Sequence, residues 1–274
     1  MKVSLGMKVY NDHRFIRQAL ASTYMAVDHI VVAVSDRPWN GEPSSPDKTL
    51  EYLHQFPDHS HKIQIVEGSW TKESDHVNFI LDFIREKYPD TDYYFYQDAD
   101  EVYFIETMDV ILKVLDQQRP DGFGINMRTY VKWPTWKVFP PEVGIPFVAF
   151  PLTPELFFAD DPDHCRIPHP YRDAASCVEI DSPDPRLYMH HFSYVGTPTE
   201  ISNKLAQFSH ADKVRPRWLE DVFIPATLET TNLHPTHPDT WAGLEKVSQQ
   251  TLPETVQLTY DEIVADLYEG GTHG

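Results

Sequence analysis

The sequence predicts an α/β fold with a mostly parallel central sheet and helices on both faces. Segments with the apolar pattern of strands alternate with segments that carry apolar residues at helical spacing. The first half of the chain holds three such strand–helix units in succession, and a chain of 274 residues can bury a large core. This alternation is typical of a parallel sheet whose ligand crevice lies at the carboxyl ends of the strands.

The expected elements follow each other closely in the first half. Each strand is rich in β-branched or aromatic residues, and each helix repeats apolar residues at a spacing of three or four. In the third helix those residues are Val77, Ile80, Leu81 and Ile84. The expected strands are 2–10, 28–36, 62–67 and 93–97, and the expected helices are 14–24, 47–56 and 73–87.

The fourth strand ends in an acidic sequence, Asp98-Ala99-Asp100-Glu101. In an extended backbone residues i and i+2 point to the same side, so Asp98 and Asp100 can present both carboxylates to one point. Hard cations such as Mg²⁺ or Mn²⁺ prefer such oxygens and complete their shell with water and phosphate. Two acids in a turn are more often a solvated loop, but the position at a strand end favours a metal that holds a diphosphate.

Other polar or aromatic residues fall at the ends of the preceding strands. Asn11 and Asp12 follow the first strand, Asp36 ends the second, and Trp70 comes soon after the third. Since carboxyl ends of parallel strands share one edge of a sheet, we expect these residues to lie around the same crevice as Asp98.

Several ordered segments resemble GT-A glycosyltransferases of the large family 2 group, which use nucleotide-sugar donors. The matching segments are VYNDHRFIRQAL from Val9, DHIVVAVSD from Asp28, Trp70-x-x-Glu73 with Asn78, YYFYQDADE from Tyr93, and HHFSYV from His190 with Lys204 downstream. Together they span roughly residues 2–210. The resemblance implies a GT-A fold and transfer of a sugar from a nucleotide diphosphate, most often a UDP- or GDP-sugar.

The resemblance also implies roles for individual residues. The segment from Val9 through Asn11 to Asp12, together with Asp36, would hold the base and ribose. Asp98 and Asp100 would hold Mn²⁺ or Mg²⁺ on the donor. The remaining matched residues on the donor side are Trp70, Glu73, Asn78 and Lys204.

A later histidine often completes the metal shell in this family. His191 is the better match, with its neighbour His190 as the alternative, since only one of the two can face the site in a strand. Relatives often carry a basic residue after the Ser-Tyr-Val triplet, where this chain has Gly196. Lys204 or Arg128 would then have to neutralise the diphosphate.

An inverting transferase needs a carboxylate to take the proton of the acceptor hydroxyl. The catalytic candidates are Asp160, Asp161 and Asp163, with Glu142 behind them. An acidic surface turn is the more ordinary explanation of the same cluster, and a retaining enzyme needs no such base. The sequence leaves the stereochemistry open.

The charge of the chain bounds its partners. With 23 basic and 42 acidic residues the net charge is −19, which disfavours broad binding to nucleic acid or to anionic membranes. No apolar run is long enough to span a membrane and no signal peptide is recognised, so we expect a cytoplasmic protein. Cys165 and Cys177 are expected as free thiols, a zinc site being the weaker alternative.

We expect three regions along the chain. Residues 1–130 would bind the nucleotide sugar, 131–214 would form the acceptor side of the same domain, and 215–274 would be a helical extension that packs on the catalytic half or on a second subunit. Proline and aromatic residues accumulate at 131–170, which predicts loops and short edge strands. In the last region helices are expected at 240–249 and 260–268.

Three functions fit these observations. The first is metal-dependent sugar transfer to a hydroxyl of a glycan, a lipid-linked acceptor or a small molecule. The second is the same chemistry on a protein or on a modified nucleic-acid base, the latter being disfavoured by the acidic composition. The third is a non-catalytic module that binds a cation or a sugar nucleotide through Asp98 and Asp100.

Overall fold

The structure is a computed structural model. It describes residues 1–142, 144–160, 168–170, 177–180, 182, 184, 186–208 and 210–270. Of Glu269 and Gly270 it describes the backbone alone. Asp161, Asp163 and Cys165 lie outside these residues. Cys177 carries a free thiol. Among the described helices, none combines the length and apolar character that a membrane span requires.

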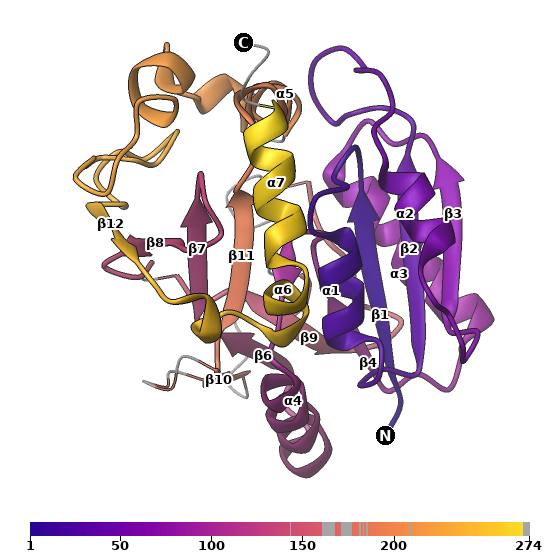
Figure 1. Cartoon of the computed structure of the whole chain (residues 1–274). Coiled ribbons are helices and arrows are strands. Elements are labelled where there is room, and N and C mark those ends of the chain that lie inside the picture. The colour runs from indigo at the N-terminus through magenta and orange to yellow at the C-terminus, as the bar shows by residue number, and fades with distance from the viewer. Residues whose placement is uncertain are drawn as a thin grey trace.

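A seven-stranded sheet forms the larger half of the molecule (Figure 1). Its strand order is β10-β6-β9-β4-β1-β2-β3, with β1, β2, β3 and β4 all parallel to one another. The predicted class, α/β with a mostly parallel sheet and helices on both faces, is confirmed. The strands are β1 (Val3–Val9), β2 (His29–Ser35), β3 (Ile63–Gly68), β4 (Tyr93–Tyr96), β6 (Gly122–Ile125), β9 (Phe147–Pro151) and β10 (Cys177–Ile180).

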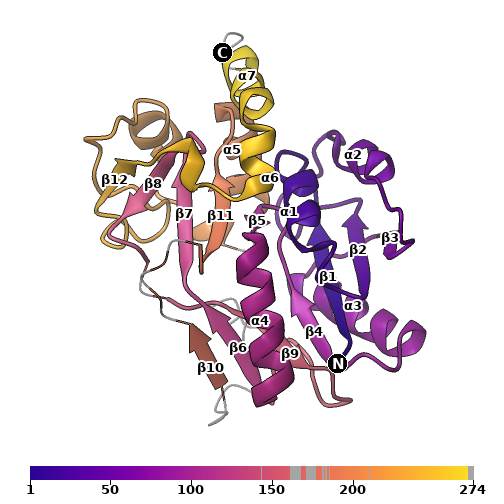
Figure 2. The same cartoon turned by 60° about the horizontal axis from the view of Figure 1, so that its bottom comes forward.

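Helices cover both faces of this sheet. On one face α1 (Ile16–Thr23) and α4 (Ile105–Gln118) bury apolar side chains against β1, β2 and β6, while α2 (Thr49–Gln55) packs on α1. On the other face α3 (Glu73–Lys87) buries the four apolar residues that the sequence singled out. Figure 2 shows α4 alongside β6. Two cores on opposite faces hold the sheet rigid, so its strand ends are a firm base for a site.

Strand β9 departs from the expectation of edge strands in the region rich in proline. It lies between β4 and β6 and is antiparallel to both. The expectation was wrong for this strand because Pro151 comes only at its end, where a missing N–H does not interrupt the ladder. β9 therefore joins the later part of the chain to the strand that precedes Asp98.

A second sheet of five strands forms the smaller half, with the order β12-β8-β7-β11-β5. α5 (Pro198–Gln207) packs beside it, and a cluster around Trp218 and Trp241 fills its core. The strands are β5 (Glu101–Val102), β7 (Met127–Val131), β8 (Trp136–Phe139), β11 (Met189–Tyr194) and β12 (Gly243–Lys246).

The last sixty residues are less helical than predicted. Where a helix was expected at 240–249 the chain forms β12, which pairs with β8, because a partner distant in sequence overrides local helical spacing. The expected second helix is present as α7 (Tyr260–Gly270), preceded by α6 (Glu254–Leu258). Short 3₁₀ turns occupy Ala211–Lys213 and Gln249–Thr251, and a π-helical turn occupies Leu219–Phe223. α6 packs on α1, and α7 lies in front of the boundary between the two halves in Figure 1.

Candidate functional site

A cavity of about 500 Å³ opens where the carboxyl ends of β1 and β4 face β11 and α5. Both halves of the molecule contribute to its wall. Of the residues singled out from the sequence, those in this wall are Asn11, Asp12, Glu73, Asp98, Asp100, His191 and Lys204. The sheet thus gathers at one point residues that lie up to two hundred positions apart in the chain.

The two aspartates reach the cavity through a turn rather than an extended strand. β4 ends at Tyr96, and the backbone N–H of Glu101 donates to the carbonyl of Asp98 at 3.2 Å. The buried Glu101 carboxylate accepts the N–H of Asp98 at 3.0 Å, and Gln97 donates to the carbonyl of Glu101 at 2.7 Å. These bonds fix the turn, so Asp98 and Asp100 both reach the cavity but contact different residues.

Asp98 is held by a lysine from inside the sheet. Lys8 Nζ donates to Asp98 Oδ1 at 2.6 Å and lies 3.2 Å from Glu73 Oε1. The Lys8 side chain is only 6% exposed and its ammonium also lies over the rings of Trp39 and Tyr96, at 4.9 and 5.2 Å from their centres. A cation desolvated this far needs such partners, so Lys8, Asp98 and Glu73 form one unit.

Asp100 is held by a lysine from the other half. Lys204 Nζ lies 2.5 Å from Asp100 Oδ2 and 3.4 Å from Asp12 Oδ2. Burial alone would raise the pKa of Asp100, but Lys204 and then His191 outweigh it and the pKa is lowered. Burial raises the pKa of Asp12 to about 7 although Lys204 opposes the rise, and Asp100 adds to it.

Local structure explains why Lys204 points into the cavity. α5 begins with a capping box, in which Thr197 and Glu200 bind each other's backbone N–H groups. Arg14 Nη2 donates to both carboxylate oxygens of Glu200 at 2.5 Å, which ties α5 to the start of α1. Lys204 is one turn beyond Glu200 on the same helix face and therefore faces the cavity too.

His191 is the histidine that lines the cavity, and His190 is not. β11 pairs with β5 directly after the aspartate turn, and the N–H of Phe192 donates to the carbonyl of Asp100 at 2.9 Å. This pairing brings His191 Nε2 to 3.5 Å from Asp100 Oδ1. His190 points into the core, where its Nδ1 lies 2.8 Å from the hydroxyl of Tyr130.

The donor set around Asp100 suits a divalent metal. A carboxylate oxygen and an imidazole nitrogen 3.5 Å apart can serve as neighbouring ligands of Mn²⁺, whose bonds to such atoms are near 2 Å. Asp98 could add an oxygen as a further ligand, since a carboxylate has two and Lys8 bonds Oδ1. Within the described part of the chain, no three His, Cys, Asp or Glu side chains are already arranged as a complete metal site.

The loop after β1 is pinned to the loop before α2. Asn11 adopts a left-handed backbone (φ 43°), which asparagine tolerates, and its Nδ2 donates to Ser44 Oγ at 2.9 Å. The N–H of Asp12 donates to Thr49 Oγ1 at 3.0 Å, and His13 Nδ1 lies 2.8 Å from Asp47 Oδ2. The wall that faces Asp100 is therefore formed before any ligand binds.

Five residues with expected roles lie outside the cavity wall. Val9 is buried in the core, and Asp36 is exposed beside Arg37. Trp70 stacks on His76 with ring centres 4.2 Å apart, and Asn78 bonds the backbone of Phe158. These contacts support the larger sheet.

The fifth of these residues, Asp160, is exposed and pairs with Lys72 at 2.7 Å. Glu142 bonds the Thr129 hydroxyl, and burial raises its pKa. Of the two cations considered for the diphosphate, Lys204 lines the cavity, whereas the Arg128 guanidinium stacks on the Tyr188 ring.

Sequence reasoning missed Lys8, Trp39 and His13, all of which line the cavity. A lysine two residues before the end of an apolar strand was the available signal for Lys8, because such a charge must have partners if the strand is central. For Trp39 the signal was an aromatic residue shortly after the end of the second strand.

Comparison with known proteins gives a remote likeness in structure. No protein-family model and no curated protein matches the sequence. The crystal structure of S. aureus TarS 1–349 is 15% identical with a TM-score of 0.48, over 75% of this chain and 63% of that one. The same fragment with UDP-GlcNAc gives 15% identity and a TM-score of 0.49, over 75% and 64%.

The crystal structure of S. aureus TarS is 14% identical with a TM-score of 0.45, over 98% of this chain and 54% of that one. The chain therefore spans less than two thirds of the length of these three structures. Similarity at this level says nothing about activity, so the function must be inferred from the site itself.

Proposed function

We propose that the protein is a glycosyltransferase that moves a sugar from a nucleotide-diphosphate donor to a hydroxyl acceptor. The observation that supports it best is one cavity in which Asp98 and Asp100 are each held by a lysine from a different half, with His191 beside Asp100. Fixed charges of both signs at the carboxyl ends of a parallel sheet suit a ligand that carries a diphosphate.

The chemistry assigned to the site is stabilisation of the leaving nucleotide diphosphate. Asp100 and His191 would hold Mn²⁺ or Mg²⁺, with Asp98 as a further ligand, and the bound metal would neutralise charge that develops on the diphosphate. Lys204 lies next to Asp100 and places a second positive charge at the same point, in the role that relatives give to a basic residue where this chain has Gly196.

The wall formed by Asn11, Asp12 and Trp39 is assigned to the nucleoside. Trp39 offers a ring face for the base, and the fixed loop after β1 offers polar groups for the ribose. A UDP- or GDP-sugar is the expected donor. We assign no general base, because Asp160 pairs with Lys72 outside the cavity and its neighbours Asp161 and Asp163 are outside the described residues.

Calorimetric titration with UDP-, GDP-, CDP- and dTDP-sugars, with Mn²⁺ or with excess chelator, tests the proposal. We expect one donor to bind only with the cation, and that complex to release its sugar to water or to an added acceptor. Asp100→Asn should abolish cation-dependent binding and lower turnover by about a hundredfold or more, whereas Asp160→Asn should change neither. Full activity of Asp100→Asn in excess chelator would disprove the metal assignment.

The same titration separates the alternative functions. A donor that binds tightly but is never consumed, with any acceptor, would indicate a binding module. Retardation of duplex DNA in a gel would favour a nucleic-acid acceptor, which the net charge of −19 disfavours.

A further inference from the structure

The end of the cavity beyond α5 is chemically unlike the rest of its wall. Here the wall consists of Asn203, Gln207, Phe208, His210, His234, Thr236 and His237, and none of these is acidic. The nearest wall carboxylate along α5 is Glu200, which is neutralised by Arg14. In a protein of net charge −19, a wall section without carboxylates and with three imidazoles is a distinct local environment. We call His210, His234, Thr236 and His237 the histidine end.

The turn that carries the histidine end is firmly braced. Arg215 donates its backbone N–H to the carbonyl of Pro235 at 2.9 Å and its guanidinium to the carbonyl of Asn232 at 2.6 Å. Trp218 Nε1 donates to the carbonyl of Leu233 at 2.7 Å. The guanidinium of Arg215 thus bonds a neutral backbone carbonyl in this loop, and its positive charge stays beside the histidines.

His234 is oriented as a hydrogen-bond donor. Its Nδ1 accepts the backbone N–H groups of Thr236 at 3.1 Å and His237 at 2.9 Å, which assigns the ring proton to Nε2. The ring packs edge-on against Trp241 at 4.4 Å. Burial first, and then the electrostatic effects of His237, Arg215 and His210, lower the pKa of His234 to about 4. Among these neighbours the Arg215 guanidinium carries a permanent positive charge.

We propose that the histidine end is the acceptor subsite and that it selects an acceptor with an anionic group, namely a sugar phosphate or a sugar acid. This inference rests on the proposed function, since it names the acceptor of the same cavity. An anion here would meet imidazole N–H donors and lie near the charge of Arg215, with no carboxylate among the described wall residues of this end to repel it. A neutral sugar would gain the hydrogen bonds without the charge.

The test uses calorimetric titration of the full chain with Mn²⁺ and saturating UDP, or GDP if that is the nucleotide that binds, so that the donor part of the cavity is filled. The probes are glucose 6-phosphate, glucuronate and glucose. We expect at least one anionic probe to bind about tenfold more tightly than glucose. His237→Gln, an exposed and structurally mild change, should lower that affinity about tenfold, should lower glucose binding less, and should leave nucleotide binding unchanged.

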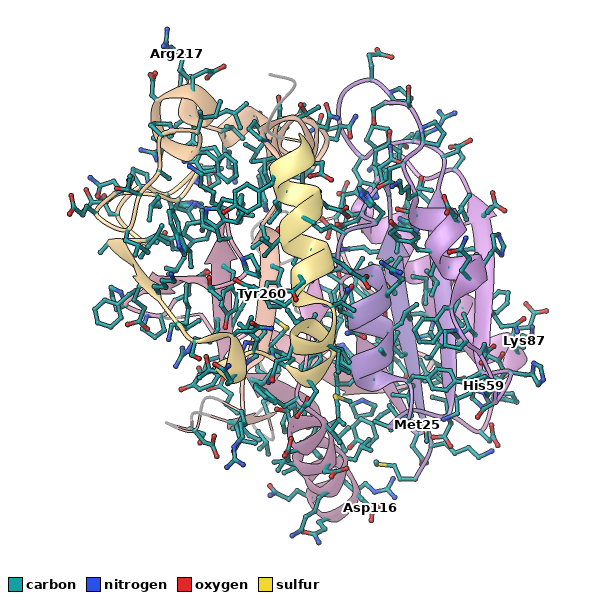
Figure 3. The ribbon with its side chains drawn as sticks, viewed as in Figure 1. Met25, His59, Lys87, Asp116, Arg217 and Tyr260 are labelled. Atoms are coloured by element: carbon teal, nitrogen blue, oxygen red, sulfur yellow. The ribbon has the colours of Figure 1, made fainter. Side chains whose placement is uncertain are left out.

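Two further variants complete the design. His234→Gln should have the same effect as His237→Gln, and if it fails to fold, His237→Gln decides alone. His59→Gln is the matched control, because His59 is exposed and far from the histidine end. Figure 3 shows His59 at the opposite side of the molecule from Arg217, which lies two residues after Arg215. It should bind all probes like the wild type.

The outcomes separate this inference from the proposed function. Failure of the wild type to bind any of the four nucleotide sugars would overturn the function, whereas equal binding of glucose and both anions in the nucleotide complex would overturn the acceptor inference alone. Anion binding that occurs without nucleotide but disappears when the nucleotide saturates the cavity would also overturn it, because the histidine end would then bind the donor diphosphate. A preference for glucose 6-phosphate or for glucuronate would support it and name the anionic group.

Discussion

The two halves of the molecule hold the two aspartates of the same turn in different ways. In the larger half, Lys8 reaches Asp98 from within the sheet and is 6% exposed, so its charge is enclosed by protein. In the smaller half, Lys204 reaches Asp100 from the surface of α5 and is 32% exposed, so its charge also faces the cavity. The difference indicates that Lys8 serves the fold and that Lys204 is available to a ligand.

The largest effect is expected from Lys204→Met. Loss of this charge should lower sugar transfer by about a hundred- to a thousandfold, as for other fixed charges that stabilise a leaving group. The matched control is Lys137→Met, because Lys137 also pairs with a carboxylate, Glu245, at 2.6 Å in the same half but outside the cavity. Initial rates with saturating donor measure both. Undiminished transfer by Lys204→Met would remove Lys204 from the proposed mechanism.

Lys8→Met should mainly change stability. Removing a buried cation leaves Asp98 and Glu73 without their shared partner, which should lower the free energy of unfolding by about 3 kcal/mol. Urea unfolding measures this, and Lys137→Met should cost less than about 1 kcal/mol in the same assay. The double variant Lys8→Met with Asp98→Asn should recover part of the loss. Equal costs for the two lysines would contradict the contrast drawn between the halves.

Acid should weaken the larger half through His76. Burial first and then Lys8 lower the pKa of His76 to about 3, although the carbonyl of Ala33 opposes this, whereas the unfolded chain has the ordinary value of 6.5. The unfolded state therefore binds more protons, and stability present above pH 6.5 is lost as the pH falls toward 3. At pH 5 the loss from this group should be about 2 kcal/mol.

His76→Phe should remove that part of the acid sensitivity. The measurement is the change in unfolding free energy between pH 7.5 and pH 5 for the variant and the wild type. His234, whose pKa is lowered to about 4, should still give the smaller half its own acid-dependent loss. An identical pH dependence in both proteins would show that His76 does not titrate as described.

The smallest effect concerns the nucleoside wall of the larger half. Trp39→Ala should raise the donor KM about tenfold with little change in kcat, because stacking contributes equally to the ground and transition states. Asp36→Ala, the change that sequence reasoning would favour, should alter the donor KM less than twofold, since Asp36 is exposed and outside the cavity wall. A larger effect at Asp36 would restore the sequence-based assignment.

The two halves also differ in how well the sequence predicts them. In the first hundred residues of the larger half, strands and helices alternate along the chain, so local periodicity was sufficient to predict them, and α3 has the bounds expected from the sequence. In the later part of the same half, α4 was not foreseen, and the central position of β9 contradicted the expectation of edge strands. In the smaller half β12 pairs with β8 and β11 with β7, across long stretches of chain. Local patterns carry no information on such partners, which is why β12 was expected as a helix.

The candidate site shows the same division. The aspartates, His191 and Lys204 could be identified from motifs in their expected order, and the structure brings all four to one cavity. Lys8 was missed although its place in an apolar strand was a signal, because a lysine in a strand normally marks a solvated face and its partner Asp98 lies ninety positions later. The histidine end depends on the path of the C-terminal segment, for which the sequence offered no recognisable pattern.

The central position of β9 bears on how the protein is made. β4, which leads to Asp98, pairs with β1 on one side and with β9 on the other, and β9 is complete only at Pro151. When residues 1–130 have left the ribosome, β4 is therefore an unpaired edge strand of the sheet, and strands of neighbouring chains can pair with it. The strand β4 is protected only after the next segment has emerged, so a nascent chain stalled in this interval is the form most prone to aggregate.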